Sequence, residues 1–278
     1  MRKIKIVADS SCDLFSIKDI PYACAPMKVS TDEKEFVDDI SLDVDEMVDY
    51  LYGYKGKSKS SCPNTSDWLD AFSDADDIFC VTITSGLSGS YNSACAAKQI
   101  FETENEGKRV HVFDSLSAGP EITLVIEKIV ECVKQNMDYE DICNKVSAYM
   151  KKTGLVFMLK SLKNFANNGR VSPLVAKLVG IAGICIVGKA SDEGTLEPMH
   201  KCRGERRSLE TLAKVLEDEG FQSGKISISH CQNESAALRL KECILTKFKN
   251  VQLEIHKTCG LCSFYAEKGG ILVGFEKA

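Results

Sequence analysis

Two kinds of apolar pattern alternate along the first half of the chain. Residues 4–8 and 78–83 are compact apolar runs of strand length, whereas residues 41–52 carry apolar side chains at helical spacing on one side. Such an alternation is typical of β-α-β units, in which helices cover a parallel sheet. We therefore expect an α/β fold with an N-terminal parallel sheet and flanking helices.

The same patterns predict the remaining elements. In the first half they indicate a strand at 110–113 and helices at 68–72, 91–101, 121–135 and 139–152, and residues 22–30 form a further apolar run. In the second half they indicate strands at 156–159, 225–229 and 270–275 and a helix at 234–248. Because the second half lacks regular alternation, we expect two domains. Residues 1–152 form the N-terminal α/β domain in this prediction, and residues 153–278 form a mixed C-terminal α/β domain.

Composition and charge exclude several classes of function. The formal net charge is −5 over 278 residues, which gives no general electrostatic basis for binding nucleic acid. The longest apolar stretch, residues 178–188, is too short for a membrane span and contains three glycines. We therefore expect neither a nucleic-acid partner nor a membrane-spanning segment.

Thirteen cysteines are scattered along the chain, mostly inside apolar runs. Their odd number and their placement indicate reduced thiols that fill the core, as in a cytoplasmic protein. The chain also opens on a strand-like segment where a secretory protein would carry a signal. Cys259 and Cys262 form an isolated pair without a second pair of ligands, so we expect no metal site.

The most informative polar segment is residues 84–93, which read Thr-Ser-Gly-Leu-Ser-Gly-Ser-Tyr-Asn-Ser directly after an apolar run. A turn from strand to helix gathers backbone N–H groups, hydroxyls and the positive end of a helix dipole, which suits an anion. The segment lacks the lysine of a P-loop and the Gly-x-Ser-x-Gly of a nucleophile elbow. We therefore expect Ser85 and Ser88 to hold a carboxylate or a phosphate, with no catalytic residue.

Other polar groups each have two interpretations. The turn at residues 9–11 either lies on a ligand-binding rim, with the turns at 84–86 and 114–115, or caps the next helix. Ser60 and Ser61 open a polar turn ahead of a helix, which on spacing alone is a plain loop.

His230 and Arg203 also have two interpretations each. His230 follows a strand and either faces a cleft or is a satisfied structural histidine. Arg203 belongs to a basic run with Lys201, Arg206 and Arg207, which is either a solvated face or a docking surface for an acidic partner. The apolar tract at 174–187 has two interpretations. It is either part of the core, or it leaves room for a slender apolar ligand, because it contains the small residues Ala176, Gly180, Ala182 and Gly183.

Taken together, these motifs resemble the DegV family of bacterial fatty-acid-binding proteins. Residues 6–14 look like that family's Asp-Ser-x-x-Asp-Leu opening, and residues 60–63 are similar to its Thr-Ser-Gln-Pro turn. Residues 85–94 are close to its most specific signature, Asp114-Ser115 matches an Asp-Ser pair, and residues 168–172 resemble its Gly-Gly-Arg-Ile-Ser block. The order and spacing of these blocks run nearly from end to end.

The resemblance implies two α/β domains with a long-chain fatty acid held between or inside them. It implies that Ser60, with Ser61, and the second serine of the signature, Ser88, hold the carboxylate, with Ser85 in the same loop. It also implies a separate ATP-dependent fatty-acid kinase that converts the presented acid into an acyl phosphate. Arg170 matches the arginine of that handover, with His230 and Arg203 as further rim residues. The bound acid is a ligand, and no further cofactor is implied.

The sequence departs from the family pattern at several positions. Ser60 stands where the family has threonine, Cys62 stands where it has glutamine, and we identify no clear counterpart of its C-terminal Thr-His-x-Gly-Pro-Gly block. Two alternative functions therefore stay open. One is a serine-dependent acyl- or phosphoryl-transfer enzyme with Ser88 or Ser85 as nucleophile, and the other is a binding module that senses a small anion.

Overall fold

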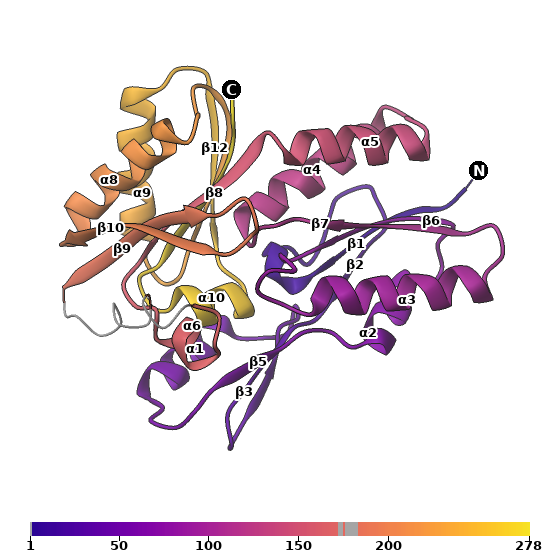
Figure 1. The fold of residues 1–278 in the computed structure, drawn as a ribbon, viewed down its shortest axis with the longest axis horizontal. Coiled ribbons are helices and arrows are strands. Elements are labelled where there is room, and N and C mark those ends of the chain that lie inside the picture. The colour runs from indigo at the N-terminus through magenta and orange to yellow at the C-terminus, as the bar shows by residue number, and fades with distance from the viewer. Residues whose placement is uncertain (1, 172–174, 176–182) are drawn as a thin grey trace.

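The computed structural model describes residues 2–171, 175 and 183–278, and it contains two large sheets and one small one (Figure 1). The N-terminal sheet has the strand order β2-β1-β6-β7, the C-terminal sheet has the order β10-β9-β8-β13-β11-β12, and the small sheet has the order β4-β3-β5. The described part of the chain is thus an α/β fold with one parallel and one mixed sheet, as the sequence predicts.

The N-terminal sheet is parallel throughout and is buried on both faces. Its strands are β1 (Ile4–Asp9), β2 (Tyr22–Ala25), β6 (Asp77–Thr82) and β7 (Arg109–Asp114). Ile78 and Cys80 of β6 pack under α2 (Thr65–Phe72) and α3 (Ser90–Glu104), whereas Phe79 and Val81 face α4 (Pro120–Lys134) and α5 (Tyr139–Met150). Because both faces are covered, β6 reads as a continuous apolar run rather than an alternating one.

The C-terminal sheet joins antiparallel and parallel strands. Its strands are β8 (Thr153–Leu159), β9 (Ile184–Ala190), β10 (Leu196–Arg203), β11 (Gly224–His230), β12 (Val251–Lys257) and β13 (Ile271–Glu276). Only β11 and β12 pair in parallel among these neighbours. One face packs under α8 (Glu205–Asp218) and α9 (Glu234–Lys247). The other face is turned toward α1 (Val44–Gly53) and α10 (Gly260–Ala266), and toward the N-terminal sheet.

Side-chain alternation along β8 and β13 separates these two faces. Val156 and Met158 lie in the core beneath α8 and α9, whereas Leu155, Phe157 and Leu159 point the other way. Alternation with a period of two is what a pleated strand imposes. The strand therefore supplies a row of large apolar side chains to the space between the two sheets.

A glycine lets the two halves of the molecule approach closely. At Gly274 of β13 an added Cβ would lie 2.5 Å from backbone atoms of Pro120 and Glu121, at the start of α4. Only a residue without a side chain allows the helix backbone to cross the strand at this distance. Helix α4 therefore packs on both large sheets.

The elements that the sequence predicts are present, but β9, β10, β12, α8, α10 and the small sheet are not predicted, and one apolar run is interpreted incorrectly. Residues 22–30 are not one segment, because the chain leaves the parallel sheet after β2 and enters the small antiparallel sheet as β3 (Lys28–Ser30). Pro26 lies between the two strands and cannot donate to a ladder. The small sheet is completed by β4 (Glu35–Val37) and β5 (Lys59–Ser61). Within the tract at 174–187, residues 174 and 176–182, with Ala176, Gly180 and Ala182, lie outside the described residues, as does Ser172.

Two further sequence expectations concern cysteines and membranes. The thirteen cysteines are all free, and none is exposed. No helix within the described ranges is long and apolar enough to cross a membrane. The predicted domain boundary between residues 152 and 153 stays a prediction, although β8 begins at Thr153.

Candidate functional site

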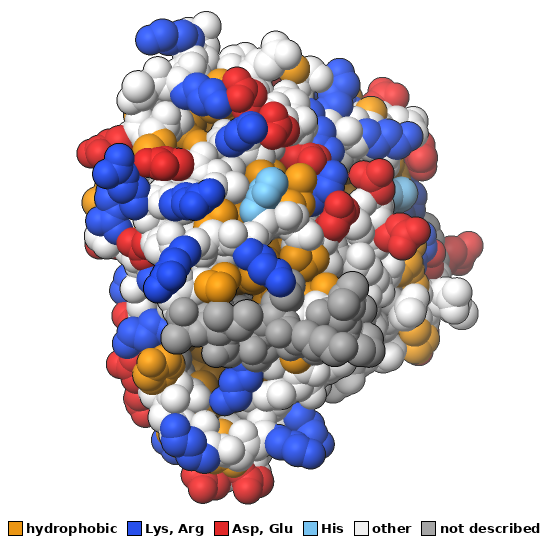
Figure 2. All heavy atoms as spheres, turned by 60° about the vertical axis from the view of Figure 1, so that its left-hand side comes forward, with side chains coloured by type: hydrophobic (Ala, Val, Ile, Leu, Met, Phe, Trp, Pro, Cys, Tyr) orange, Lys and Arg blue, Asp and Glu red, His pale blue; other side chains and the backbone are white. Residues whose placement is uncertain are grey.

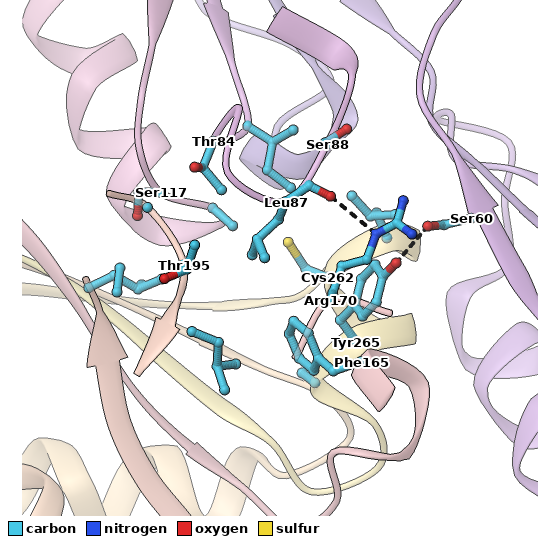
Figure 3. Close-up of a pocket in the computed structure, with 18 of the residues that line it drawn as sticks. Ser60, Thr84, Leu87, Ser88, Ser117, Phe165, Arg170, Thr195, Cys262 and Tyr265 are labelled. Atoms are coloured by element: carbon cyan, nitrogen blue, oxygen red, sulfur yellow. Dashed lines mark hydrogen bonds between the residues drawn. The ribbon is translucent and has the colours of Figure 1, made fainter. Parts of the chain in front are cut away.

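A largely apolar cavity of about 310 Å³ lies between the two large sheets and the end of the small one (Figure 3). Its walls come from the β6–α3 loop, β5, β8, α6 (Lys163–Asn167), the β9–β10 hairpin and α10. Leu155, Phe157 and Leu159 form the row from β8, and Leu196, Leu261 and Leu272 lie on other walls. Polar side chains are confined to a few positions, which is the usual make-up of a small-molecule site.

The loop that carries Ser88 is held in place by one buried carboxyl group. Asp9 is fully buried, and it accepts hydrogen bonds from the Ile83 backbone N–H at 3.0 Å and from the Ser90 hydroxyl at 2.5 Å. It also accepts from Ser11, as the cap of the short 3₁₀ turn Ser10–Cys12. Burial raises the pKa of Asp9, although the bonds that it accepts oppose that change. Asp9 thus supports the loop and caps a turn, and it does not line the cavity.

Ser88 is left with a free donor in this arrangement. Its Oγ accepts a hydrogen bond from the Ser90 N–H at 3.3 Å, and its own proton has no acceptor among the described residues. Ser61 lies nearby in the cavity lining, with an exposed side chain.

Ser60 and Tyr265 form a pair of hydroxyls in the lining of the cavity. The Oγ of Ser60, on β5, lies 2.7 Å from the Oη of Tyr265, on α10 (Figure 3). Burial raises the pKa of Tyr265, so the phenol stays protonated. Two hydroxyls carry two protons, and their mutual bond uses one, so the pair retains one free donor.

Arg170 lies beside this pair. Its Nε donates to the carbonyl oxygen of Leu87 at 3.2 Å, and its Nη1 donates to the carbonyl of Asn168, while Nη2 has no acceptor in the described part of the chain. We call the cavity wall formed by Ser60, Ser61, Ser88, Arg170 and Tyr265 the donor end. It gathers several unused hydrogen-bond donors and no carboxylate, which suits an anion.

Hydroxyls also line the opposite part of the cavity, at Thr84, Ser117 and Thr195, and we call this part the closed end (Figure 3). Ser117 donates to the buried carboxyl of Glu121 at 2.5 Å, and the hydroxyls of Thr195 and Ser191 lie 2.9 Å apart. The Thr84 hydroxyl accepts from the Gly86 N–H at 3.0 Å. Ser117 thus uses its proton within the protein, whereas Thr84 accepts a backbone hydrogen bond as Ser88 does, and Thr195 belongs to a pair of hydroxyls as Ser60 does.

The closed end is sealed by the tip of the β9–β10 hairpin. Gly194 has φ +71°, and an added Cβ there would lie 2.0 Å from the Thr84 hydroxyl oxygen and 2.9 Å from the backbone of Leu116. A Cβ at Gly86 would lie 2.7 Å from the carbonyl oxygen of Glu193. The hairpin tip therefore packs tightly on the loops after β6 and β7.

The structure brings Ser60, Ser61, Ser88 and Arg170 together on one cavity, and it places three other predicted residues elsewhere. Ser85 is exposed, and its N–H donates to Asp114 at 3.0 Å outside the cavity lining. His230 is 4% exposed and lines a separate polar cavity of about 430 Å³ near the start of α1, where its Nδ1 accepts from Asn233 at 3.3 Å. Desolvation lowers the pKa of His230.

Arg203 is exposed at the end of β10, away from the cavity lining. The rest of its basic run is interspersed with acidic side chains: Arg206 pairs with Glu210 at 3.0 Å. Figure 2 shows basic and acidic side chains mixed over the face that carries the left-hand side of Figure 1. No group of three or more histidine, cysteine, aspartate or glutamate side chains among the described residues is arranged to hold a metal ion.

Sequence reasoning misses Tyr265 and the hydroxyls of the closed end. A tyrosine within the segment Gly-Leu-Cys-Ser-Phe-Tyr-Ala gives no signal of its own, because its partner Ser60 lies more than 200 residues earlier. Thr84, by contrast, opens the polar segment that the sequence singles out.

Two further carboxyl groups position α10 and hence Tyr265. Asp38 accepts hydrogen bonds from the N–H groups of Gly260 and Leu261 at 2.6 and 2.8 Å, and Asp13 accepts from Cys259 at 2.7 Å. Burial raises the pKa of Asp13 to about 7 and that of Asp38 to about 6, and the nearby carboxylates add to both. Carboxylates at a helix start satisfy N–H groups that have no partner inside the helix.

The fold and the cavity together define an α/β protein with a largely apolar cavity between its two large sheets. The chain belongs to the DegV family: the model of that family, described as "Uncharacterised protein, DegV family", matches residues 3–277. A DegV domain-containing protein of Streptococcus pneumoniae strain R6 is 41% identical over 276 residues, which is 98% of each chain. The resemblance inferred from the motifs is confirmed.

Solved structures of similar proteins contain fatty acids. A DegV family protein from Eubacterium eligens loaded with heptadecanoic acid is 41% identical, with a TM-score of 0.96 over 99% of this chain and 100% of that one. The Streptococcus pneumoniae Fatty Acid Kinase (Fak) B3 protein loaded with linoleic acid is 40% identical, with the same TM-score and coverage. A DegV family protein from Ruminococcus gnavus with vaccenic acid is 28% identical, with a TM-score of 0.90 over 99% and 100%.

Proposed function

We propose that this protein binds a long-chain fatty acid in the cavity and carries it to a fatty-acid kinase, which makes the acyl phosphate. The carboxylate lies at the donor end, where the hydroxyls of Ser60, Ser61 and Ser88 hold it. Ser85 has no part in this clamp, because it is exposed outside the cavity lining.

The observation that carries the proposal is the difference between the two ends of one apolar chamber. At the donor end, protons on Ser88, on the Ser60–Tyr265 pair and on Arg170 have no acceptor among the described residues. Arg170 is the cation among the described lining residues and lies at this end, whereas Ser117 at the closed end donates to the buried carboxyl group of Glu121. A ligand that matches this arrangement has an anionic head and a long apolar tail.

The energetics suit such a ligand. Burying an acyl chain of about fourteen methylenes contributes roughly 11 kcal/mol before costs, at about 0.8 kcal/mol each. Association entropy offsets much of this gain. A carboxylate cannot enter an apolar chamber unpaired, and hydrogen bonds to a charged group contribute about 1.5–3 kcal/mol each. The tail therefore supplies affinity and the hydroxyls fix the orientation.

A carrier role fits the chemistry of the site better than a serine nucleophile does. Within the described ranges no histidine lines the cavity, so Ser88 has no general base beside it. Hydroxyl donors leave a carboxylate reactive, which suits cargo that a second enzyme must phosphorylate. The similar Streptococcus pneumoniae protein, a fatty-acid kinase B3 protein loaded with linoleic acid, supports a kinase as the partner. Arg170 and Arg203 stay our candidates for residues that face it, whereas His230 is too buried to do so.

Organic extraction of the purified protein followed by mass spectrometry tests the binding. We expect about one long-chain fatty acid per chain, and weaker retention in Ser88→Ala. An empty protein that also ignores added palmitate and oleate would disprove the proposal. Equal binding of short and long carboxylates would instead support an anion-sensing module, and turnover of acyl esters abolished by Ser88→Ala would support an enzyme.

The handover is tested separately. Incubation of the loaded protein with a fatty-acid kinase and ATP should yield the acyl phosphate of the bound acid. Binding without any conversion by such a kinase would retain the lipid-binding part of the proposal and remove the carrier role.

A further inference from the structure

Tyr265 has a distinctive place at the donor end, since Ser60 is its one side-chain hydrogen-bond partner among the described residues. The two oxygens are 2.7 Å apart and come from two separate elements, β5 and α10. Both residues line the cavity. A ligand head that reaches one hydroxyl therefore meets a pair that is already coupled.

The acidity of the two hydroxyls indicates which of them donates the hydrogen bond. A phenol is a better proton donor than an aliphatic alcohol, so the bond runs from Tyr265 Oη–H to Ser60 Oγ when an anion is present. Ser60 then directs its own proton toward the anion. A hydroxyl that accepts one hydrogen bond becomes a stronger donor in the next, because the chain of bonds is polarised.

We propose that Tyr265 is a positioning residue for the fatty-acid carboxylate: it donates to Ser60 and thereby orients and strengthens the hydrogen bond from Ser60 to the acid. This inference rests on the proposed function and adds to it a residue that no motif marks. It also assigns a role to the serine at position 60, whose small side chain has one rotatable hydroxyl that needs a partner to fix it.

The surroundings of Tyr265 hold its ring in one place. The ring centroid lies 4.7 Å from that of Phe165 and 4.9 Å from that of Phe264, in tilted and edge-on arrangements. Asp38 secures the start of the same helix through two backbone N–H groups. Burial raises the pKa of the phenol, so the proton remains available for donation at neutral pH. A fixed ring and a retained proton are what an orienting donor requires.

Tyr265→Phe removes the hydroxyl and keeps the ring contacts. We would measure the affinity of the delipidated protein for palmitate and for hexadecanol, which has the same tail and an uncharged head. The variant should bind palmitate roughly three- to tenfold more weakly than wild type, as expected for the loss of one neutral hydrogen bond, that from Tyr265 to Ser60. Hexadecanol affinity should change less than twofold. Tyr149→Phe is the matched control, because that hydroxyl donates to Glu276 at 2.8 Å outside the cavity lining.

A double-mutant cycle with Ser60→Ala tests whether Tyr265 acts through Ser60. In the Ser60→Ala background, Tyr265→Phe should produce no further loss of palmitate affinity. Full additivity of the two losses would overturn the inference, as would equal losses for palmitate and hexadecanol, which indicate a packing role. If wild type binds no palmitate, the proposed function fails. If wild type binds it and Ser88→Ala weakens binding while Tyr265→Phe does not, only the role of Tyr265 fails.

Discussion

The two ends of the cavity are built from similar hydroxyl side chains and differ in the groups that surround those hydroxyls. At the donor end, Ser88 and the Ser60–Tyr265 pair each retain a proton without an acceptor among the described residues, whereas Ser117 at the closed end donates to Glu121. The type of residue is the same and the environment decides its use. Hydroxyls in a cavity lining are therefore informative only after their hydrogen bonds have been assigned.

A similar contrast holds for the residues behind the cavity lining, where each end has a buried carboxyl group. Asp9 is 0% exposed and holds the loop of Ser88 through Ile83 and Ser90, leaving Ser88 itself free. Glu121 is 6% exposed and binds the lining hydroxyl Ser117 directly. One carboxyl supports the backbone of the site, and the other occupies a side chain that would otherwise face the ligand.

The strongest test of this comparison removes two hydroxyls from one end at a time, in two separate double variants. The double variant Ser60→Ala/Ser88→Ala should weaken palmitate binding by about 3 kcal/mol or more, roughly a hundredfold, because two hydrogen bonds to a charge are lost. The matched pair Thr84→Val/Thr195→Val should change palmitate affinity less than threefold. Titration calorimetry on delipidated protein measures both, with hexadecanol as the uncharged reference.

The two double variants also provide the contradicting outcome. If the threonine pair weakened palmitate binding as much as the serine pair does, the carboxylate would not be confined to the donor end. Loss of hexadecanol binding by the serine pair would indicate a collapsed cavity in place of a lost anion contact.

A second variant acts on the seal of the closed end. Gly194→Ala places a Cβ against Thr84 and Leu116 at a residue with φ +71°. The strained backbone and the overlap should together reduce the free energy of unfolding by about 2–4 kcal/mol. Urea denaturation measures this loss, and the preference for palmitate over hexadecanol should be retained.

Gly107→Ala is the control for Gly194→Ala. Gly107 has φ +79° and nothing within 4 Å of an added Cβ, so the variant should lose only about 1 kcal/mol from the backbone term. Equal losses at the two glycines would show that the hairpin tip does not pack on the loops as described.

The sequence identifies site residues in continuous turns better than those that reach the cavity from distant elements, for a physical reason. Ser60 and Ser88 belong to continuous polar turns, whose composition is visible in the chain itself. Tyr265 and Thr195 reach the cavity from distant elements, and their roles arise only from tertiary contacts. Local patterns report turns, and they do not report partners far apart in the chain.

The fold shows the same division. Strands β1, β6 and β7 are short apolar runs and helices α3 to α5 are long segments, and all are predicted within a few residues. The small sheet is missed, because β3, β4 and β5 have three residues each and too short a pattern to detect. Its strand β5 nevertheless carries Ser60, so the missed element positions a predicted site residue.

The smallest expected effect concerns the electrostatic support of the donor end. Asp13 accepts a hydrogen bond from Cys259, just before α10. Burial is the main cause that raises the pKa of Asp13 from 3.8 to about 7. Its Oδ2 is buried without a hydrogen-bond partner among the described residues. The folded protein therefore holds this proton more tightly than the unfolded chain does. The free energy of unfolding should decrease as the pH rises from about 4 to about 7. Over this range Asp13 ionises readily in the unfolded chain, whereas the folded protein resists its ionisation.

Asp13→Asn should remove part of this decrease, on the order of 1–2 kcal/mol between pH 4 and 8, while Asp38, with a pKa raised to about 6, retains the rest. Asparagine tolerates the positive φ of 59° at this position. Asp19→Asn is the matched control, because Asp19 also has a positive φ, 67°, and is exposed. Urea denaturation across the pH range compares the variants. An unchanged pH dependence in Asp13→Asn would mean that Asp13 is ionised in the folded protein, and that α10 starts on a fully charged pair of carboxylates.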